Sequence, residues 1–293
     1  MLKSKKSEEG SPLMWHFSQF QNYVFDLYGT LVSIRTDENQ PALWKWLCDY
    51  YQAFGSHYTP AMLRRQYHQI ILKEETAMKK KTGCQYPEVQ LEQVFLRLLE
   101  EGPGASGIRL ETQSARKAWA AATANAFRIS SRLWLRPYPG AKKLLGRLKA
   151  QGKRIYLLSN AQSVFSLPEI AQCGLMELFD DIWISSDHGI KKPEPLFLSS
   201  LMDAHRMAAS ETIMIGNDPV SDMGIAVACG ISGAWIQSDH RTKKQRREFI
   251  QSLAEIYSTE GAARIQERSS IQALYAELCA DYPMQDLLLC GNS

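Results

Sequence analysis

The stretch YVFDLYGTLV, residues 23–32, decides which fold we expect for the chain. A short apolar run, Tyr23–Phe25, stops at the acid Asp26, and a glycine and a threonine follow within four residues. An apolar run bounded by turn residues in this way predicts a strand that is buried in a parallel sheet. The strand therefore carries a carboxylate to its carboxyl end, just before a sharp turn that contains Tyr28.

Two kinds of periodicity follow this first strand. Residues 41–130 show apolar residues at helical spacing in about four segments, and Thr59-Pro60 is typical of a helix start. From residue 137 onward, strand patterns alternate with amphipathic helix patterns, which predicts a parallel sheet with helices on both faces. The expected strands are RIYLLSN (154–160), DIWISSD (181–187), ETIMIGND (211–218) and GAWIQ (233–237).

The change of periodicity predicts an α/β fold in which a helical domain interrupts the sheet domain. We expect a Rossmann-like three-layer core with a parallel sheet, formed by residues 19–36 and 136–293, and an inserted α-helical domain, residues 37–135. Residues 1–18 are expected to form a flexible tail. Two further segments, 240–265 and 269–281, are expected to form surface helices.

Composition and charge exclude several classes of function. The chain has 293 residues, of which 45% are hydrophobic and 22% charged, as in an ordinary soluble globular protein. Its net charge of +3 is too small to indicate a nucleic-acid partner, and the basic segments 79–81 and 241–248 are expected to be solvated helix faces. No stretch is long and apolar enough to span a membrane, and the N-terminus lacks the apolar region of a signal peptide. We therefore expect neither a nucleic-acid nor a membrane partner.

The six cysteines form no CxxC pair and show no metal-ligand spacing. Such cysteines are typical of a reducing compartment, so we expect a cytoplasmic protein. Nothing in the sequence indicates the oligomeric state.

Polar side chains stand at the ends of three of the expected strands. In an open parallel sheet, ligands bind outside the carboxyl ends of the strands, so these side chains can converge although they are far apart in sequence. Between the second and the third of these strands, Lys192-Pro193 stands just ahead of an expected helix. The residues concerned are Asp26, Ser159, Asn160, Lys192, Asp218 and Asp222.

This set of side chains fits a magnesium-dependent reaction of a phosphate group. Three carboxylates that lie together raise one another's pKa values, and a magnesium ion with oxygen ligands removes that conflict. The hydroxyls of Thr30 and Ser159 and the amide of Asn160 can hold phosphate oxygens, and a lysine adds a positive charge near the same anion. One carboxylate is then free to attack phosphorus and form an acyl phosphate that water hydrolyses.

Four short motifs, in order along the chain, resemble those of the haloacid dehalogenase-like (HAD) hydrolase superfamily. They are DLYGTL (26–31), LLSN (157–160), KKPEP (191–195) and GNDPVSD (216–222). The phrase RPYPGAKKLLGRLKAQGKRIYLLSN (136–160) also resembles the phosphatase-like branch, in which a helical cap is inserted after the first motif. The resemblance implies that residues 37–135 form this cap and close over a small phosphorylated substrate.

The resemblance also implies a role for each motif residue. Asp26 would be the nucleophile of an aspartyl-phosphate intermediate, and Lys192 would neutralise the phosphate and steady Asp26. Thr30 or Ser159 would bind the transferring group, with Asn160 beside it. Magnesium would be held by Asp26, the backbone carbonyl of Tyr28, Asp218 and Asp222. The expected activity is that of a magnesium-dependent phosphatase on a small phosphorylated metabolite.

Tyr28 departs from this pattern. In most phosphatases of the superfamily an acid stands two residues after the nucleophile, where it protonates the leaving group and then activates water. A tyrosine with an ordinary pKa of about 10 can donate a proton but is a poor base near neutrality. The DxYGT variant is similar to that of the metal-independent 2-haloacid dehalogenases, so this activity is the alternative.

The fourth motif supports the phosphatase and contains an ambiguity. The fourth motif of the dehalogenases resembles a pattern with an asparagine three residues before the last acid. This chain has Pro219 at that position. Either Asn217 or Asp218 can occupy the metal-ligand position, and we expect Asp218 because it is charged. Because Tyr28 replaces the usual acid, a non-catalytic module that binds phosphate ligands is a further alternative.

Overall fold

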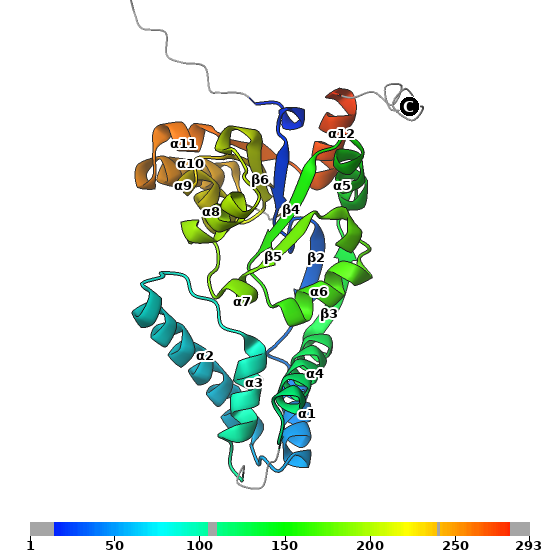
Figure 1. Ribbon diagram of the computed structural model, residues 1–293, viewed down its shortest axis with the longest axis vertical. Helices are drawn as coiled ribbons and strands as arrows, with labels where there is room; N and C mark the ends of the chain where they lie inside the picture. The colour runs from blue at the N-terminus through cyan, green and yellow to red at the C-terminus, as the bar shows by residue number, and fades with distance from the viewer. Residues whose placement is uncertain (1–14, 105–109, 239–240, 282–293) are drawn as a thin grey trace, which may run out of the picture.

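A six-stranded parallel sheet forms the centre of the protein (Figure 1). The computed structural model describes residues 15–104, 110–238 and 241–281. The strand order is β5-β4-β1-β6-β7-β8. The strands are β5 (Asp181–Ile184), β4 (Arg154–Ser159), β1 (Asn22–Phe25), β6 (Thr212–Gly216), β7 (Ser232–Ile236) and β8 (Ile265–Arg268). The predicted α/β fold with a parallel sheet is therefore confirmed.

The strand that ends at Asp26 lies near the middle of the sheet. All four residues of β1 are buried, as their apolar run predicts. From β1 the chain adds β4 and β5 on one side, and then β6, β7 and β8 on the other side. The strand order therefore reverses between β1 and β6, and the carboxyl ends at such a reversal are where open α/β sheets bind ligands.

Helices cover both faces of the sheet. Tyr23 and Phe25 of β1 pack into a core with α5, α6 and α12, and Val24 packs into a second core with α8, α9, α10 and α11. Successive residues of a strand point to opposite faces, so one strand contributes to both cores. These helices are α5 (Ala141–Ala150), α6 (Ser163–Gln172), α12 (Ile271–Asp281), α8 (Pro195–Ala204), α9 (Gly224–Ala228), α10 (Lys243–Ile256) and α11 (Thr259–Ala263).

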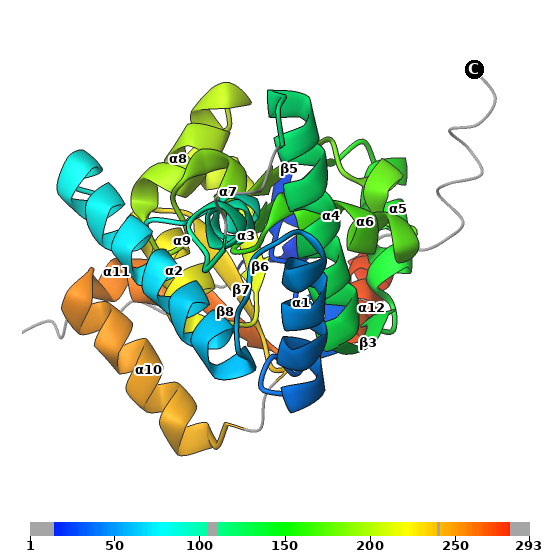
Figure 2. The ribbon, with the colours of Figure 1, turned by 90° about the horizontal axis from the view of Figure 1, so that it is seen from below.

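Four helices between β2 and β3 extend below the sheet in Figure 1 and have a hydrophobic core of their own. They are α1 (Pro41–Ala53), α2 (Pro60–Thr82), α3 (Leu91–Glu100) and α4 (Gln113–Ser131). Seen from below in Figure 2, α1, α2 and α4 surround α3 and the elements behind it. Thr59 caps α2 by accepting a hydrogen bond from the backbone of Met62, as the Thr-Pro pair predicts.

Short elements complete the structure. The strands β2 (Val32–Thr36) and β3 (Arg132–Pro137) form an antiparallel pair that leads to the four helices and back. The sequence analysis missed this pair: VSIRT alternates apolar and polar residues over only a few positions, and RLWLRP does not alternate. The remaining short helices are η1 (Phe17–Gln19), η3 (Met176–Leu178), α7 (Ser185–His188), η4 (Ala209–Glu211) and the π-helical turn η5 (Pro219–Met223).

Two predictions about the ends of the chain hold only in part. Positions 1–14 of the predicted flexible tail, residues 1–18, lie outside the described residues. The remaining positions are not a tail, because Trp15 and Phe17 are buried and the Trp15 indole donates a hydrogen bond to the carbonyl of Arg264. Helices are present in both predicted segments, as α10, α11 and α12, and α10 has a single buried residue, Leu253. The expectation of a surface helix is wrong for α12, because Leu274 and Leu278 are fully buried, and the strand at residues 265–268 was not predicted.

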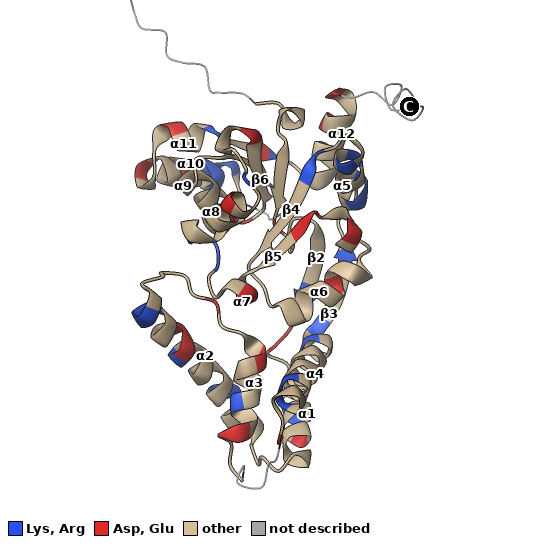
Figure 3. Ribbon diagram, in the orientation of Figure 1, with Lys and Arg blue, Asp and Glu red and all other residues tan. Residues whose placement is uncertain are grey.

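Charged residues are distributed over both the sheet domain and the four helices (Figure 3). The described part of the chain contains no helix that is long and apolar enough to cross a membrane.

Candidate active site

Lys192 bridges two carboxylates at the carboxyl end of the central strands. Its ammonium nitrogen lies 2.8 Å from Oδ1 of Asp26 and 2.7 Å from Oδ1 of Asp222. Asp26 directly follows β1, Asp222 lies in η5 directly after β6, and Lys192 lies in the loop before α8. Asp222 is fully buried and Lys192 is 2% exposed. We call Asp26, Lys192 and Asp222 the lysine cluster.

The lysine cluster is short of positive charge, because two acids share one ammonium group. Burial raises the pKa of Asp222 to about 7, and the nearby Asp26 adds to the rise. Burial acts to lower the pKa of Lys192, but the two carboxylates outweigh it, so that this pKa lies above its ordinary value. Lys192 is therefore positively charged at neutral pH.

Thr30 and Asn217 lie on the other side of Asp26. The Thr30 hydroxyl is 3.1 Å from Oδ2 of Asp26 and 3.2 Å from Oδ1 of Asn217. Gly29 makes this approach possible: it has a φ of +87°, and a Cβ atom at this position would lie 2.5 Å from the Asn217 amide. The DLYGT turn therefore needs a glycine at this position to bring Asn217 close to the turn that follows Asp26.

Ser159 and Asn160 stand at the end of β4, as predicted, but have different partners. The Ser159 hydroxyl is buried and has no hydrogen-bond partner among the described residues, so it is free to bind a ligand oxygen. The Asn160 amide donates to the carbonyl of Lys192 at 2.8 Å and accepts from the backbone N–H of Lys192 at 2.7 Å. Asn160 therefore holds the backbone of the lysine in place.

The structure does not bring three carboxylates together. Oδ1 of Asp218 accepts hydrogen bonds from the backbone N–H and the hydroxyl of Ser221, at 2.7 and 3.0 Å, so it caps η5. Within the described residues, no group of three or more His, Cys, Asp or Glu could hold a metal ion. The expected metal set of Asp26, Asp218 and Asp222 therefore stays a prediction: Asp218 contacts Asp222 through its backbone N–H at 2.9 Å, and Asn217 is the residue linked to Asp26 through the Thr30 hydroxyl.

The residues around Asp26 still fit a magnesium ion, but through a different set of ligands from the one expected. Asp26 is one carboxylate, and the Asn217 amide oxygen, which contacts the Thr30 hydroxyl beside Asp26, is a neutral oxygen donor. The Tyr28 backbone carbonyl, two residues after Asp26, is a second neutral donor of the kind expected from the sequence. Magnesium commonly binds through one or two carboxylates and keeps several waters. The excess negative charge of the lysine cluster also favours a cation nearby.

The Tyr28 hydroxyl is directed to a buried glutamate that the sequence did not single out. Tyr28 donates a hydrogen bond to Glu169, and its hydroxyl lies 3.1 Å from that of Ser166. Glu169 also receives Arg128 Nε at 2.9 Å and Arg132 Nη1 at 3.0 Å. We call these five residues the Glu169 cluster. Burial raises the pKa of Tyr28, and Glu169 raises it further, so the phenol stays protonated.

One sequence signal could have identified Glu169. Phe165, Ser166, Glu169 and Ile170 are the buried residues of α6, and they are spaced three and four apart as one helix face requires. An acid on an otherwise buried face is rare unless it is paired. Its position therefore indicates a buried ion pair, although the partners cannot be read from the spacing.

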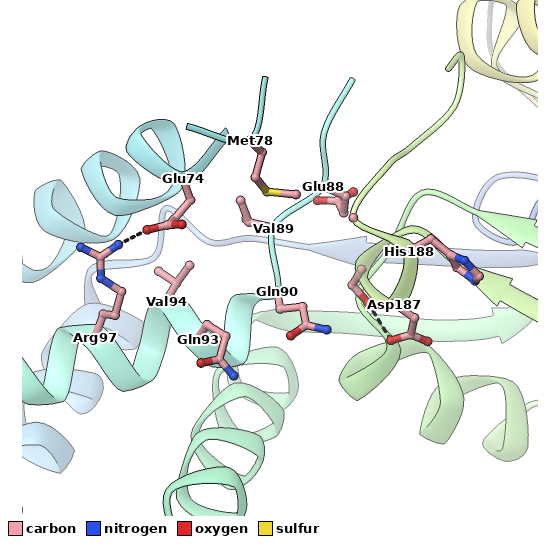
Figure 4. A pocket seen from close by; sticks show the side chains of 12 residues that line it. Glu74, Met78, Glu88, Val89, Gln90, Gln93, Val94, Arg97, Asp187 and His188 are labelled. Carbon is pink, nitrogen blue, oxygen red and sulfur yellow. Dashed lines mark hydrogen bonds and ion pairs between the residues drawn. The ribbon is translucent and has the colours of Figure 1, made fainter. Parts of the chain in front are cut away.

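A cavity of about 560 Å³ lies where the four-helix region meets the core, outside the lysine cluster (Figure 4). Three carboxylates line the cavity, from Glu74, Glu88 and Asp187. Among the lining residues, Arg97 is the single lysine or arginine, and it is paired with Glu74. This lining is unfavourable for a phosphate dianion. The cavity is therefore not the expected phosphate site.

The chain between α2 and α3 closes this side of the four-helix region against the core. We call residues 86–91 the strap. The backbone N–H of Glu88 donates to the carbonyl of Gly189 at 3.0 Å, and that of Lys191 donates to the carbonyl of Tyr86 at 2.9 Å. The strap thus lies against the loop that leads to Lys192.

Comparisons with known proteins agree with this site. A family model described as haloacid dehalogenase-like hydrolase matches residues 20–230. Glyceraldehyde 3-phosphate phosphatase from Pyrococcus abyssi is 29% identical over 119 residues, which cover 41% of this chain and 50% of that protein. Phosphoserine phosphatase from Thermus thermophilus is 30% identical over 145 residues, which cover 50% of this chain and 53% of that protein. The chain thus spans about half the length of these curated relatives.

A solved structure of similar fold belongs to a 2-haloacid dehalogenase from Pseudomonas syringae pv. Tomato. It is 18% identical, the match covers 90% of this chain and 99% of that chain, and the TM-score is 0.57. At this identity the likeness supports the fold alone. The family model, in contrast, extends over all four motifs and most of the sheet. This chain belongs to the haloacid dehalogenase-like hydrolase family and is an enzyme of the hydrolase class.

Proposed function

We propose that the protein is a magnesium-dependent phosphatase that acts on a small phosphorylated metabolite through an aspartyl-phosphate on Asp26. One observation carries the proposal: Lys192 holds Asp26 at the carboxyl end of the central strand, and this lysine is itself held by Asp222 and Asn160. A carboxylate that is fixed beside a buried ammonium group is oriented for attack on an anionic phosphate.

Each neighbouring side chain then has a defined task. In the first step, an oxygen of Asp26 bonds to phosphorus, the bond from phosphorus to the leaving oxygen breaks, and this oxygen takes a proton from water to leave as the alcohol. Lys192 compensates charge on the phosphate oxygens, and the free hydroxyl of Ser159 is available as a hydrogen-bond donor to them. In the second step, water attacks phosphorus, and inorganic phosphate and the free Asp26 carboxylate are produced.

A magnesium ion would be held by the Asp26 carboxylate, the backbone carbonyl of Tyr28 and the Asn217 amide, with waters completing the shell. When bound, it would neutralise charge on the phosphate. In this arrangement Asp222 serves Lys192 and Asp218 caps η5. We propose Asn217 as a ligand because its amide oxygen is 3.2 Å from the Thr30 hydroxyl, which itself contacts Asp26.

Two further observations support a phosphatase in a reducing compartment. The curated relatives described above are named as phosphatases of small phosphorylated molecules. The five described cysteines are free thiols, which fits the cytoplasm. A soluble cytoplasmic enzyme without nucleic-acid or membrane partners is therefore part of the proposal.

Tyr28 and Asn217 favour a second candidate, a metal-independent 2-haloacid dehalogenase. In this reaction Asp26 attacks the carbon that carries the halogen, halide leaves, and water hydrolyses the resulting ester. Tyr28 stands where most phosphatases of the superfamily have an acid, and Asn217 provides an amide where they have a metal-binding carboxylate.

The test is release of inorganic phosphate from a broad panel of phosphate esters, with magnesium and with a chelator, run beside halide release from 2-haloacids. Magnesium-dependent phosphate release is the expected result, and it would also rank the substrate classes. Halide release that persists in the chelator would replace the phosphatase by the dehalogenase. Tight phosphate binding without either reaction would identify a non-catalytic binding module.

A further inference from the structure

Glu169 joins three segments that lie far apart in the sequence. Tyr28 belongs to the turn that follows Asp26, Arg128 to the last turn of α4, and Arg132 is the first residue of β3, where the chain returns to the core. All three bind the carboxylate of Glu169, which is 2% exposed. Burying a carboxylate is costly unless its partners compensate it, so the cluster is stable only when these segments are in place together.

The side chains of the cluster are also packed against one another. The guanidinium of Arg128 lies 5.4 Å from the centre of the Tyr28 ring and 5.2 Å from that of Phe165. The side chains of Arg128 and Arg132 are only 14% and 19% exposed. Movement of α4 relative to the core would therefore disturb the Tyr28 ring as well as the ion pairs.

We propose that Glu169 is a positioning residue that ties the nucleophile loop, residues 26–31, to the point where the chain returns from the four-helix region. Through the Tyr28 hydroxyl it fixes the turn that carries Asp26, and through Arg128 and Arg132 it fixes α4 and β3. It also keeps the Tyr28 hydroxyl occupied, so that this group does not serve as acid or base on the substrate. The effect on turnover rests on the proposed function.

The tests use single and double variants of the full chain. Tyr28→Phe removes only the hydroxyl bond, Glu169→Gln keeps the shape and an acceptor but removes the charge, and Glu169→Ala removes all three contacts. Arg136→Met is the matched control, because Arg136 is an exposed residue on the same strand as Arg132. Glu169→Gln remains informative if Glu169→Ala does not fold.

Turnover is measured on the best phosphate ester of the panel. We expect Glu169→Ala to lower kcat by about 10- to 100-fold, because a misplacement of about 1 Å can cost this much. Tyr28→Phe should lower kcat less, and it should have no further effect in the Glu169→Ala background. Arg136→Met should leave kcat unchanged. If the effects of Tyr28→Phe and Glu169→Ala on kcat multiply, or if neither variant changes kcat, the proposal is overturned.

Hydrogen exchange of the backbone amides supplies a test that needs no substrate. In Glu169→Gln and Tyr28→Phe, residues 27–31 should exchange faster, and in Glu169→Gln residues 128–136 should also do so. Faster exchange at residues 128–136 alone would mean that Glu169 stabilises only the return from α4, and the link to the nucleophile loop would be lost. A chain with no activity on any ester would refute the proposed function, while this exchange pattern would still decide the role of Glu169.

Discussion

Two buried ionic clusters in this protein have opposite charge balance. In the lysine cluster, Asp26 and Asp222 share one ammonium group. In the Glu169 cluster, one carboxylate receives two guanidinium groups and a phenol. The first cluster has one carboxylate more than its lysine can neutralise, whereas the second has one guanidinium more than its carboxylate can neutralise.

The difference separates a site suited to chemistry from a site suited to rigidity. The excess negative charge of the lysine cluster favours the binding of a cation together with an anionic ligand. The acid of the Glu169 cluster is already fully paired, so its main effect is to hold three segments together. A change in the first cluster should therefore alter activity most, and a change in the second should alter both stability and positioning.

The largest effect is expected for Asp26→Asn, which removes the proposed nucleophile. Turnover should fall by at least about 10⁴-fold, because groups that form the covalent intermediate have effects of this order. The fold should persist, since Lys192 keeps Asp222 as a partner. Phosphate release and circular dichroism would measure both results. Undiminished turnover in Asp26→Asn would exclude Asp26 as nucleophile.

The next largest effect is expected on removing the metal. Chelation should lower turnover by at least about 100-fold, because a metal ion stabilises transition-state charge by several kcal/mol. Asn217→Asp should shift the magnesium concentration for half-maximal activity downward, since a carboxylate binds the ion better than an amide. A magnesium titration of both proteins measures this shift. An identical dependence in the two proteins would remove Asn217 from the site.

Tyr28→Asp is expected to raise phosphatase activity by up to about 100-fold. The shorter side chain cannot reach Glu169 in the same way, and a carboxylate at this position can act as acid and base. The variant should lose about 1–3 kcal/mol of unfolding free energy, because the phenol and its hydrogen bond are gone. Phosphate release and urea unfolding would be compared. Unchanged activity would mean that another group supplies acid–base catalysis.

The smallest effect is a pH dependence of stability. Burial raises the pKa of Asp222 to about 7, so the folded protein binds more protons than the unfolded chain between about pH 4 and pH 7. The stabilisation from this group is complete below about pH 4 and is lost as the pH rises through 7. Relative to Asp222→Asn, the wild type should lose about 1–3 kcal/mol between pH 5 and pH 8. Urea unfolding in a chelator measures this, and parallel curves would contradict it.

The sequence predicted that Asp26, Lys192 and Asp222 would lie near one another, because the carboxyl ends of parallel strands converge, but it assigned Asp222 to a metal ion and did not predict its pairing with Lys192. The carboxyl ends of parallel strands meet at one edge, so Asp26 and Asp222 had to be close once β1 and β6 were recognised as strands. Lys192 followed from the motif before α8. The convergence of these three residues in the structure confirms that part of the prediction.

The positions of Asp218 and Glu169 depend on contacts that spacing does not encode. Asp218 bonds to Ser221 because a π-helical turn begins directly after it. We expected Asp218 as a metal ligand because it is charged, and its charge gives no indication of this capping contact. The burial of Glu169 is explained by its contacts with Arg128, Arg132 and Tyr28, which are distant in sequence. The strand β8 was also missed, because IQER has little apolar character and pairs only at the edge of the sheet.

The strap has a consequence for how this part of the protein can vary between relatives. Its two hydrogen bonds to residues 189 and 191 use backbone atoms, so most side-chain substitutions at Tyr86, Glu88 or Lys191 leave them intact. Proline at position 88 or 191 would remove a donor and open the contact. The contact between the strap and the loop before Lys192 is thus compatible with many sequence changes. Among relatives, we therefore expect the backbone path of the strap to be conserved more than its residues. Proline should be avoided at these two positions.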